Sequence, residues 1–126
     1  MILDSLYTQN DIIGSAMQAG VLRNEVITGN IANADTPGYK KKVVNFETYL
    51  DAELKSVRKT GDINLNKLKP TVQTLHSDYS YRLDGNNVDP EAEMIELYKN
   101  SARYDALQGS ILNNYKRINL VLTGIK

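Results

Sequence analysis

The chain has 126 residues, with 15 basic and 15 acidic side chains, a single His and no Cys. Its length fits one small domain spanning residues 1–126, and its charge balance argues against the phosphate attraction that dominates nucleic-acid binding. The absence of Cys excludes disulfides and thiolate metal sites.

The first fifteen residues lack the features of a secretory signal peptide. They contain Asp4 and Asp11, no Lys or Arg, and no sufficiently long apolar run. The sequence also has no stretch of about 20 apolar residues, the length that a bilayer-spanning helix needs. We therefore expect neither a cleaved signal peptide nor a membrane span.

An amphipathic helix is predicted over residues 11–33. The apolar side chains of its stripe, spaced by four and three residues, are Ile13, Met17, Ile27 and Ile31. Gly20 and Asn24 fall on the same stripe, where a stable isolated coiled coil would have larger apolar side chains.

A turn over residues 34–42 is expected to end this helix, within the stretch "NIANADTPGYKKK" of residues 30–42. Asn33 is able to take the left-handed conformation that ends helices, and Pro37 pushes Thr36 out of the α region. Pro37 and Gly38 then fit the central positions of a type II turn. Termination needs only one or two of these residues.

The surplus polar residues of this stretch indicate a further contact. Asn30 and Asn33 share one face of the last helical turn. Their side-chain amides can form hydrogen bonds with backbone groups of this turn or of another molecule. Asp35 lacks its usual N–H partner two residues on, because that residue is Pro37, so Gly38 N–H or a partner would take its place. The candidate subunit-contact residues are Asn30, Asn33, Asp35, Thr36, Pro37, Gly38 and Tyr39.

The middle segment, residues 43–88, is predicted to contain a short helix and little other regular structure. Apolar positions from Phe46 to Val57 have helical spacing, and Thr60 and Gly61 would end that helix. Residues 62–80 lack a sustained period and are expected to form a loop. Tyr79, Tyr81 and Leu83 alternate into the turn sequence "DGNN", which favours a small β-ribbon ahead of the last helix.

A long helix is predicted over residues 89–126. Asp89 can cap it, and Pro90 suits its first position. Its stripe alternates steps of three and four residues through Met94, Leu97, Ser101, Tyr104, Gln108, Ile111, Tyr115, Ile118, Leu122 and Ile125. The fold class is thus mainly α, with long terminal helices forming a coiled-coil-like core around the shorter middle segment.

The polar interruptions of both stripes have two explanations. Either these residues mark helices that are completed only in a larger assembly, or they set the register of an ordinary antiparallel hairpin; they are Gly20, Asn24, Ser101 and Gln108. Periodicity alone favours the second explanation.

Catalytic equipment is sparse. His76 is the single imidazole, lies in the least periodic part of the chain and is interpreted as a surface residue. Glu91 and Glu93 stand in the first turn of the last helix, where the helix dipole explains them. We therefore expect no catalytic residues, no metal site and no cofactor.

The stretch "NIANADTPGYK", residues 30–40, resembles the amino-terminal signature of the bacterial flagellar axial proteins, which build the rod, the hook and the hook–filament junction. Within that group, the short chain, "DGNNVD" at residues 84–89 and "NSARYDAL" at residues 100–107 are similar to proximal rod proteins. The resemblance covers both ends of the chain and says little about residues 58–78.

This resemblance implies a structural subunit that the flagellar type III apparatus exports without a cleaved signal peptide and that polymerises into the proximal rod of the basal body. Its terminal helices would pack into the core of a tube, while the signature turn would contact neighbouring subunits. The implied partners are other copies of the chain, neighbouring proximal rod subunits, the rod-base adaptor and the export gate.

Two other interpretations stay open. In the first, the chain is another rod component of the same family. In the second, it is a cytoplasmic coiled-coil adaptor, which should form a closed dimer rather than open assemblies. An enzyme is disfavoured because no residue cluster offers a nucleophile, a base or a metal cage.

Overall fold

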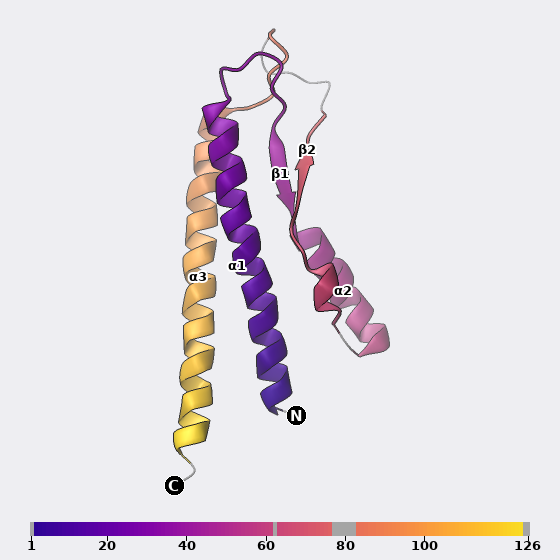
Figure 1. Cartoon of the computed structure of the whole chain (residues 1–126), viewed down its shortest axis with the longest axis vertical. Coiled ribbons are helices and arrows are strands. Elements are labelled where there is room, and N and C mark those ends of the chain that lie inside the picture. Colours follow the sequence, from indigo (N-terminus) through magenta and orange to yellow (C-terminus); the bar gives the residue numbers. More distant parts are fainter. Residues whose placement is uncertain (1, 62, 77–82, 125–126) are drawn as a thin grey trace.

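Two long antiparallel helices lie side by side, and the middle of the chain lies along one of them (Figure 1). The computed structural model describes residues 2–61, 63–76 and 83–124. Helix α1 spans Ile2–Ala32 and helix α3 spans Pro90–Thr123. At about 1.5 Å per residue, both helices are roughly 45–50 Å long. The two chain ends lie at one end of the pair, and the connecting turns lie at the other.

Helix α1 begins earlier than residue 11, where the sequence placed its start. Residues 2–10 contain no Gly or Pro, so nothing in them opposes a helix. Packing against α3 extends the helix: Asn10 is buried, and Asn114 Nδ2 donates to Asn10 Oδ1 at 2.9 Å. The start of α1 therefore depends on a contact between residues 104 positions apart, which local sequence signals do not reveal.

The start of α3 is confirmed. Asp89 Oδ1 accepts hydrogen bonds from the backbone N–H of Glu91 at 3.0 Å and of Ala92 at 3.2 Å. Pro90 occupies the first turn, where its missing N–H costs nothing. The helix ends at Thr123, and Gly124 follows as its C-cap. Ile125, the last residue of the predicted stripe, lies outside the described residues.

The middle segment has more regular structure than the sequence indicated. Strand β1, Lys42–Asn45, pairs antiparallel with strand β2, Thr71–Thr74. Helix α2, Glu47–Thr60, follows β1 and ends at Gly61 with a φ of 83°, as expected. A 3-10 helix, Leu65–Lys67, precedes β2, so within the described part of residues 62–80 these two elements depart from the predicted loop.

The β-ribbon that the structure describes is formed by other residues than the alternation at 79–83. It joins the segment after the signature turn to residues 71–74, with Val44 opposite Val72. Tyr79 and Tyr81 lie outside the described residues, and Leu83 is exposed in the turn before α3. The alternation that suggested a strand near residue 80 did not reveal the partner of β1, because strand pairing depends on tertiary contacts.

A small apolar core lies between α1 and the middle segment. Ala19, Phe46 and Leu68 form its centre, with Ile12 and Leu50 packed against it. Leu68 is fully buried although it stands between two lysines in the sequence. Helix α1 therefore contacts α3 on one side and the middle segment on the other.

The stripe of α3 that faces α1 has a different phase from the predicted one. Leu97, Tyr104, Ile111 and Ile118 are buried or half-buried, but the positions between them that turn inward are Glu93, Asn100, Leu107 and Asn114. The residues predicted at these levels, Met94, Ser101, Gln108 and Tyr115, are exposed, as is Leu122. Three of the four inward positions are polar, and the predicted stripe instead followed the apolar Met94 and Tyr115 through the polar Ser101 and Gln108.

Hydrogen bonds across the helix pair explain the buried amides. Asn100 Nδ2 donates to the carbonyl of Gly20 at 2.8 Å. Asn100 lies one heptad after Glu93 on α3, and both side chains are buried. On α1, Ile13 and Ile27 are buried, Met17 and Ile31 are half-buried, and Asn24 is exposed. Of the four interruptions, only Gly20 lies against α3, which fits the register-setting explanation, whereas Asn24, Ser101 and Gln108 are exposed.

Gly20 permits a close approach of the helices. A Cβ at this position would lie 3.2 Å from Tyr104 Cδ2, whereas a Cβ at Gly14 would meet nothing within 4 Å. We expect Gly14→Ala to raise the free energy of unfolding by about 0.5–1 kcal/mol, because Ala favours a helix over Gly. Gly20→Ala is expected to gain less than that or to lose stability. Urea unfolding followed by circular dichroism measures both, and equal gains would contradict the close approach.

Candidate functional site

The signature stretch folds into the turn that its sequence predicts. Tyr39 N–H donates to the carbonyl of Thr36 at 3.2 Å, and Gly38 has a φ of 72°, as a type II turn requires. Helix α1 ends at Ala32 without a left-handed residue: Asn33 has no positive φ, and its N–H still bonds to the carbonyls of Gly29 and Asn30, both at 3.2 Å. Asn33 therefore continues the helical bonding instead of reversing it.

Asn30 is buried and fully bonded. Its Nδ2 donates to the carbonyl of Lys42 and to Glu93 Oε2, both at 2.8 Å. Its Oδ1 accepts from Lys42 N–H at 3.0 Å and from the Tyr39 hydroxyl at 3.3 Å. An amide has two donors and two acceptor sites, and here all four are used. Of the two partners that the sequence left open for Asn30, the backbone of this turn and another molecule, the structure shows the first, and the amide has no hydrogen-bonding capacity left for a neighbour.

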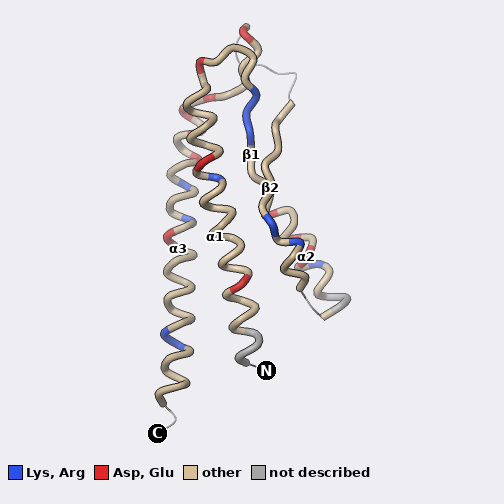
Figure 2. Tube along the Cα trace, in the orientation of Figure 1, with Lys and Arg blue, Asp and Glu red and all other residues tan. Residues whose placement is uncertain are grey.

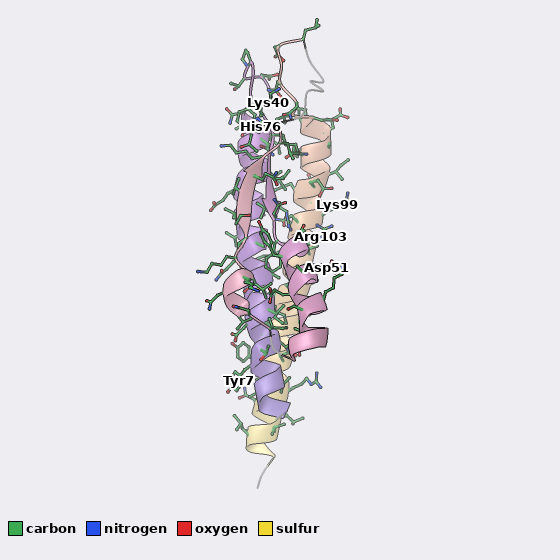
Figure 3. The ribbon with its side chains drawn as sticks, turned by 90° about the vertical axis from the view of Figure 1, so that its right-hand side faces the viewer. Tyr7, Lys40, Asp51, His76, Lys99 and Arg103 are labelled. Carbon is green, nitrogen blue, oxygen red and sulfur yellow. The ribbon has the colours of Figure 1, made fainter. Side chains whose placement is uncertain are left out.

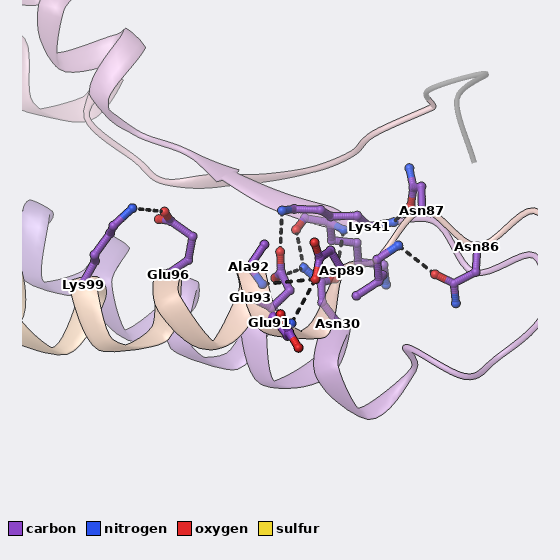
Figure 4. A network of polar contacts seen from close by, with 12 residues as sticks. Asn30, Lys41, Asn86, Asn87, Asp89, Glu91, Ala92, Glu93, Glu96 and Lys99 are labelled. Atoms are coloured by element: carbon purple, nitrogen blue, oxygen red, sulfur yellow. Dashed lines mark hydrogen bonds and ion pairs between the residues drawn. The ribbon is translucent and has the colours of Figure 1, made fainter. Parts of the chain in front are cut away.

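Glu93 carries a buried charge at the start of α3. Its side chain is 1% exposed, and its Oε1 forms an ion pair with Lys41 Nζ while its Oε2 accepts from Asn30 (Figure 4). The helix dipole alone, which was the sequence interpretation, does not explain this burial. A buried carboxylate needs a nearby opposite charge and hydrogen-bond donors, and Lys41 and Asn30 supply them.

Asn86 holds the carbonyls of the signature turn. Its Nδ2 donates to the carbonyls of Asn33 and Ala34 at 3.0 Å and of Thr36 at 2.8 Å. Its Oδ1 accepts from Val88 N–H at 2.7 Å. One buried amide thereby replaces the helical partners that these carbonyls lose where α1 ends.

The turn sequence "DGNN" at residues 84–87 docks directly onto the signature turn. Gly38 N–H donates to the carbonyl of Asp84 at 3.0 Å. Lys40 Nζ donates to the carbonyl of Gly85 at 2.7 Å, and Lys41 N–H donates to Asn87 Oδ1 at 2.6 Å. The signature stretch and the stretch at residues 84–89, which both supported the resemblance, are therefore one structural unit.

We call Asn30, Lys41, Asn86 and Glu93 the polar cluster. Sequence reasoning found only Asn30 and missed the other three, although the "DGNN" turn next to a capped helix was a usable signal. The cluster ties the end of α1, the start of β1 and the start of α3 together (Figure 4). The polar cluster is therefore an internal connector, meaning that its hydrogen bonds and ion pair join segments of the same chain.

The remaining candidate contact residues differ in exposure. Asp35, Thr36, Pro37 and Gly38 are exposed, whereas Asn33 and Tyr39 are half-buried. Asn33 Nδ2 donates to the carbonyl of Gly29 at 2.8 Å, and Thr36 Oγ1 donates to Asn33 Oδ1 at 3.2 Å. Asp35 also interacts within the chain. The exposed tip of residues 36–38 is thus the part of the stretch that a neighbouring molecule can reach.

One turn beyond the cluster, Lys99 Nζ donates to Glu96 Oε1 at 2.8 Å. This hydrogen bond lowers the pKa of the Glu96 carboxyl. Both side chains are about half exposed, so the pair adds little stability. Among the residues that the structure describes, no group of three His, Asp or Glu side chains is placed to hold a metal ion.

Comparison with known proteins identifies the family. Residues 11–40, which comprise most of α1 and the signature turn, match the family model described as "Flagella basal body rod protein". The chain is 37% identical to the flagellar basal body rod protein FlgB of Bacillus subtilis, over 89% of this chain and 91% of the relative.

The chain belongs to the flagellar basal body rod proteins.

Two further relatives are consistent with this membership. Identity is 35% to FlgB of Buchnera aphidicola, over 81% of this chain and 84% of the relative, and 34% to FlgB of Cereibacter sphaeroides, over 92% and 94%. The chain is accordingly a structural rod subunit of the basal body, where it associates with other basal body proteins. The family match ends at residue 40, so Asn86 and Glu93 lie outside it.

Proposed function

We propose that this flagellar rod protein polymerises into the proximal rod through the outer surfaces of α1 and α3, and that it has no catalytic role. The observation that carries the proposal is a series of large apolar side chains left exposed on both helices. They are Tyr7, Val21, Ile95, Tyr98, Leu112, Tyr115, Leu120, Val121 and Leu122.

The exposed apolar residues are densest in the second half of α3. Leu120 is 72% exposed and Leu122 is 65% exposed. Charged residues are also sparse at this end of the helix pair (Figure 2). Burial of each such side chain against a neighbour would contribute about 1.5–3 kcal/mol. Tyr115 and Leu122 of the predicted stripe belong to this outer surface and not to the contact with α1.

This distribution also supports ordering on assembly. Near the polar cluster, α1 and α3 are tied by buried hydrogen bonds, and their contact continues to the Asn114–Asn10 hydrogen bond and the buried Ile118. Beyond Ile118, residues 119–123 of α3 are all exposed. A segment that becomes ordered only in the rod would pass a narrow export channel more easily. We accordingly propose export by the flagellar type III apparatus without a cleaved signal peptide. The described helices include none that is long and apolar enough to cross a membrane.

The proposed partners are other copies of the chain, neighbouring proximal rod subunits, the rod-base adaptor and the export gate. The exposed tip at Thr36, Pro37 and Gly38 is a second proposed contact, at the opposite end of the helix pair from the apolar end of α3.

Pro37→Ala with Gly38→Val is expected to impair assembly more than export. Val at a φ of 72° costs about 1–2 kcal/mol, and the altered turn presents a different tip. Amounts of the chain outside the cell and in isolated basal bodies measure the two effects. Pro37→Ala alone, which keeps Gly38, is the milder control. Normal motility and intact basal bodies in cells with the double change would count against a contact at the tip.

Purified basal bodies test the proposed function directly. Removal of the chain from its bacterium should abolish motility and leave basal bodies without a rod, and mass spectrometry should find the chain in intact basal bodies. A chain that is absent from basal bodies and sediments as a closed dimer in the cytoplasm would instead support the adaptor interpretation.

A further inference from the structure

The helix pair has an arginine side and a carboxylate side at the same level. On α1, Arg23 precedes Glu25 by two residues, and on α3, Arg103 precedes Asp105 by two residues. Two residues correspond to about 200° around a helix, so the members of each pair point in nearly opposite directions. Arg23 and Arg103 line one groove of the molecule, while Glu25 and Asp105 line another.

The arginine side is an open groove of about 690 Å³. Arg23 is already paired there, since its Nη2 donates to Glu47 Oε1 at 2.7 Å and to Oε2 at 2.8 Å. Arg103, which follows Lys99 along α3 (Figure 3), makes no hydrogen bond or ion pair within the described part of the chain. Its guanidinium is therefore available to another molecule.

The carboxylate side is a smaller groove of about 300 Å³, lined by Val21 and Glu25 of α1 and by Asn100, Tyr104 and Asp105 of α3. Neither Glu25 nor Asp105 makes a hydrogen bond or ion pair with its side chain in the described residues. Asn100 is 3% exposed, and its Oδ1 is a buried acceptor without a partner. The groove thus combines apolar walls, two unpaired carboxylates and one unsatisfied acceptor.

We propose that neighbouring copies of this chain associate side by side and head to tail, with Arg103 of one copy seated in the carboxylate groove of the next. The inference rests on the proposed function and names the contact through which copies meet. A guanidinium has five donors in a plane, which suits two carboxylates, and its aliphatic stem suits the Val21 and Tyr104 walls. The match is one of charge and shape.

Because the two grooves lie at the same height along the helix pair, the copy that fills one of them must lie beside this chain. Residues 23 and 103 on one side and residues 25 and 105 on the other lie at the same height along the helix pair. A copy displaced sideways brings the groups together, whereas a copy displaced along the axis does not. Because the two surfaces differ, the interface is heterologous and repeats from copy to copy.

Disulfide trapping tests this contact, since the chain has no Cys of its own. In basal bodies assembled from a Glu25→Cys, Arg103→Cys chain, oxidation should produce a ladder of covalent dimers, trimers and larger species on a non-reducing gel. Each single substitution should leave the chain monomeric, because a head-to-tail link needs both positions. Glu25→Cys with Asp105→Cys, which places both thiols on the same side, is the matched control without a ladder.

The failed outcomes are distinguishable. If the double-Cys chain is present in rods but forms no ladder, this contact is wrong and the proposed function stands. If a single substitution yields dimers, the interface is two-fold and the proposal is also wrong. If the unmodified chain is absent from basal bodies, the proposed function fails as well.

A charge exchange keeps the test informative if the double-Cys chain does not assemble. Arg103→Asp should lower incorporation into rods roughly tenfold, because it sets three carboxylates together. Adding Asp105→Arg to the same chain restores one favourable pair and should recover at least half of the normal incorporation. Circular dichroism of the monomers checks that the exposed substitutions leave the fold unchanged. No recovery would overturn the proposal.

Discussion

Asn30→Ala is expected to lower the free energy of unfolding by about 3 kcal/mol or more. It removes the hydrogen bond to the buried Glu93 carboxylate, which keeps only its ion pair with Lys41, and it leaves both backbone polar groups of Lys42 without their Asn30 partner. Small domains have only about 5–15 kcal/mol of stability in total, so this loss is a large fraction. Urea unfolding of the dilute chain, followed by circular dichroism, measures it.

Asn33→Ala is the matched control, because the two residues lie three apart in the same stretch and have the same side chain. Asn33 Nδ2 bonds to a carbonyl of its own helix, and its Oδ1 accepts one bond from Thr36. Its replacement should cost no more than about 1 kcal/mol. If both variants kept the stability of the monomer and instead lost assembly, the two amides would serve a neighbouring subunit and the polar cluster would not be an internal connector.

The second large effect is expected at the apolar end of α3. Leu112→Asp with Leu120→Asp should reduce incorporation into rods by at least about a hundredfold, because two side chains that each contribute about 1.5–3 kcal/mol of burial are lost. Both residues are exposed in the single chain, so each substitution should change monomer stability by no more than about 0.5 kcal/mol. Quantitative mass spectrometry of purified basal bodies measures incorporation.

Two comparisons separate this effect from other causes. Gln108→Asp with Asn119→Asp adds the same charge at exposed positions of the same helix without removing an apolar side chain, and should assemble nearly normally. Ile118→Asp removes a buried side chain and should unfold the helix pair itself. Normal rods from the Leu112, Leu120 variant would show that this surface is not an assembly contact.

Local signals in the sequence predicted the local structure well. The Asp89 cap, the Pro37–Gly38 turn and the end of α2 at Gly61 depend on a few neighbouring residues, and each is confirmed. The family resemblance was likewise carried by contiguous stretches. Such features need no knowledge of what packs against them.

The parts that sequence reasoning missed depend on distant partners. Asn30 bonds to Glu93 across 63 residues, and Asn100 bonds to the Gly20 carbonyl across 80 residues. A search for apolar periodicity followed Met94 and Tyr115, so it rotated the α3 stripe by one position at alternate turns. No local signal near Asn30 pointed to Glu93 as its partner. Buried polar side chains become predictable only once their partners are known.

Hydrogen exchange of the dilute monomer and of isolated rods tests the central claim most directly, namely that the polar cluster orders one end of the helix pair and assembly orders the other. We predict that the amides of residues 28–33 and 90–96 are protected in both states. Residues 119–123, which lie beyond the last buried side chain of α3, should exchange quickly in the monomer and become protected in the rod. Equal protection of residues 119–123 and 90–96 in the monomer would contradict the account.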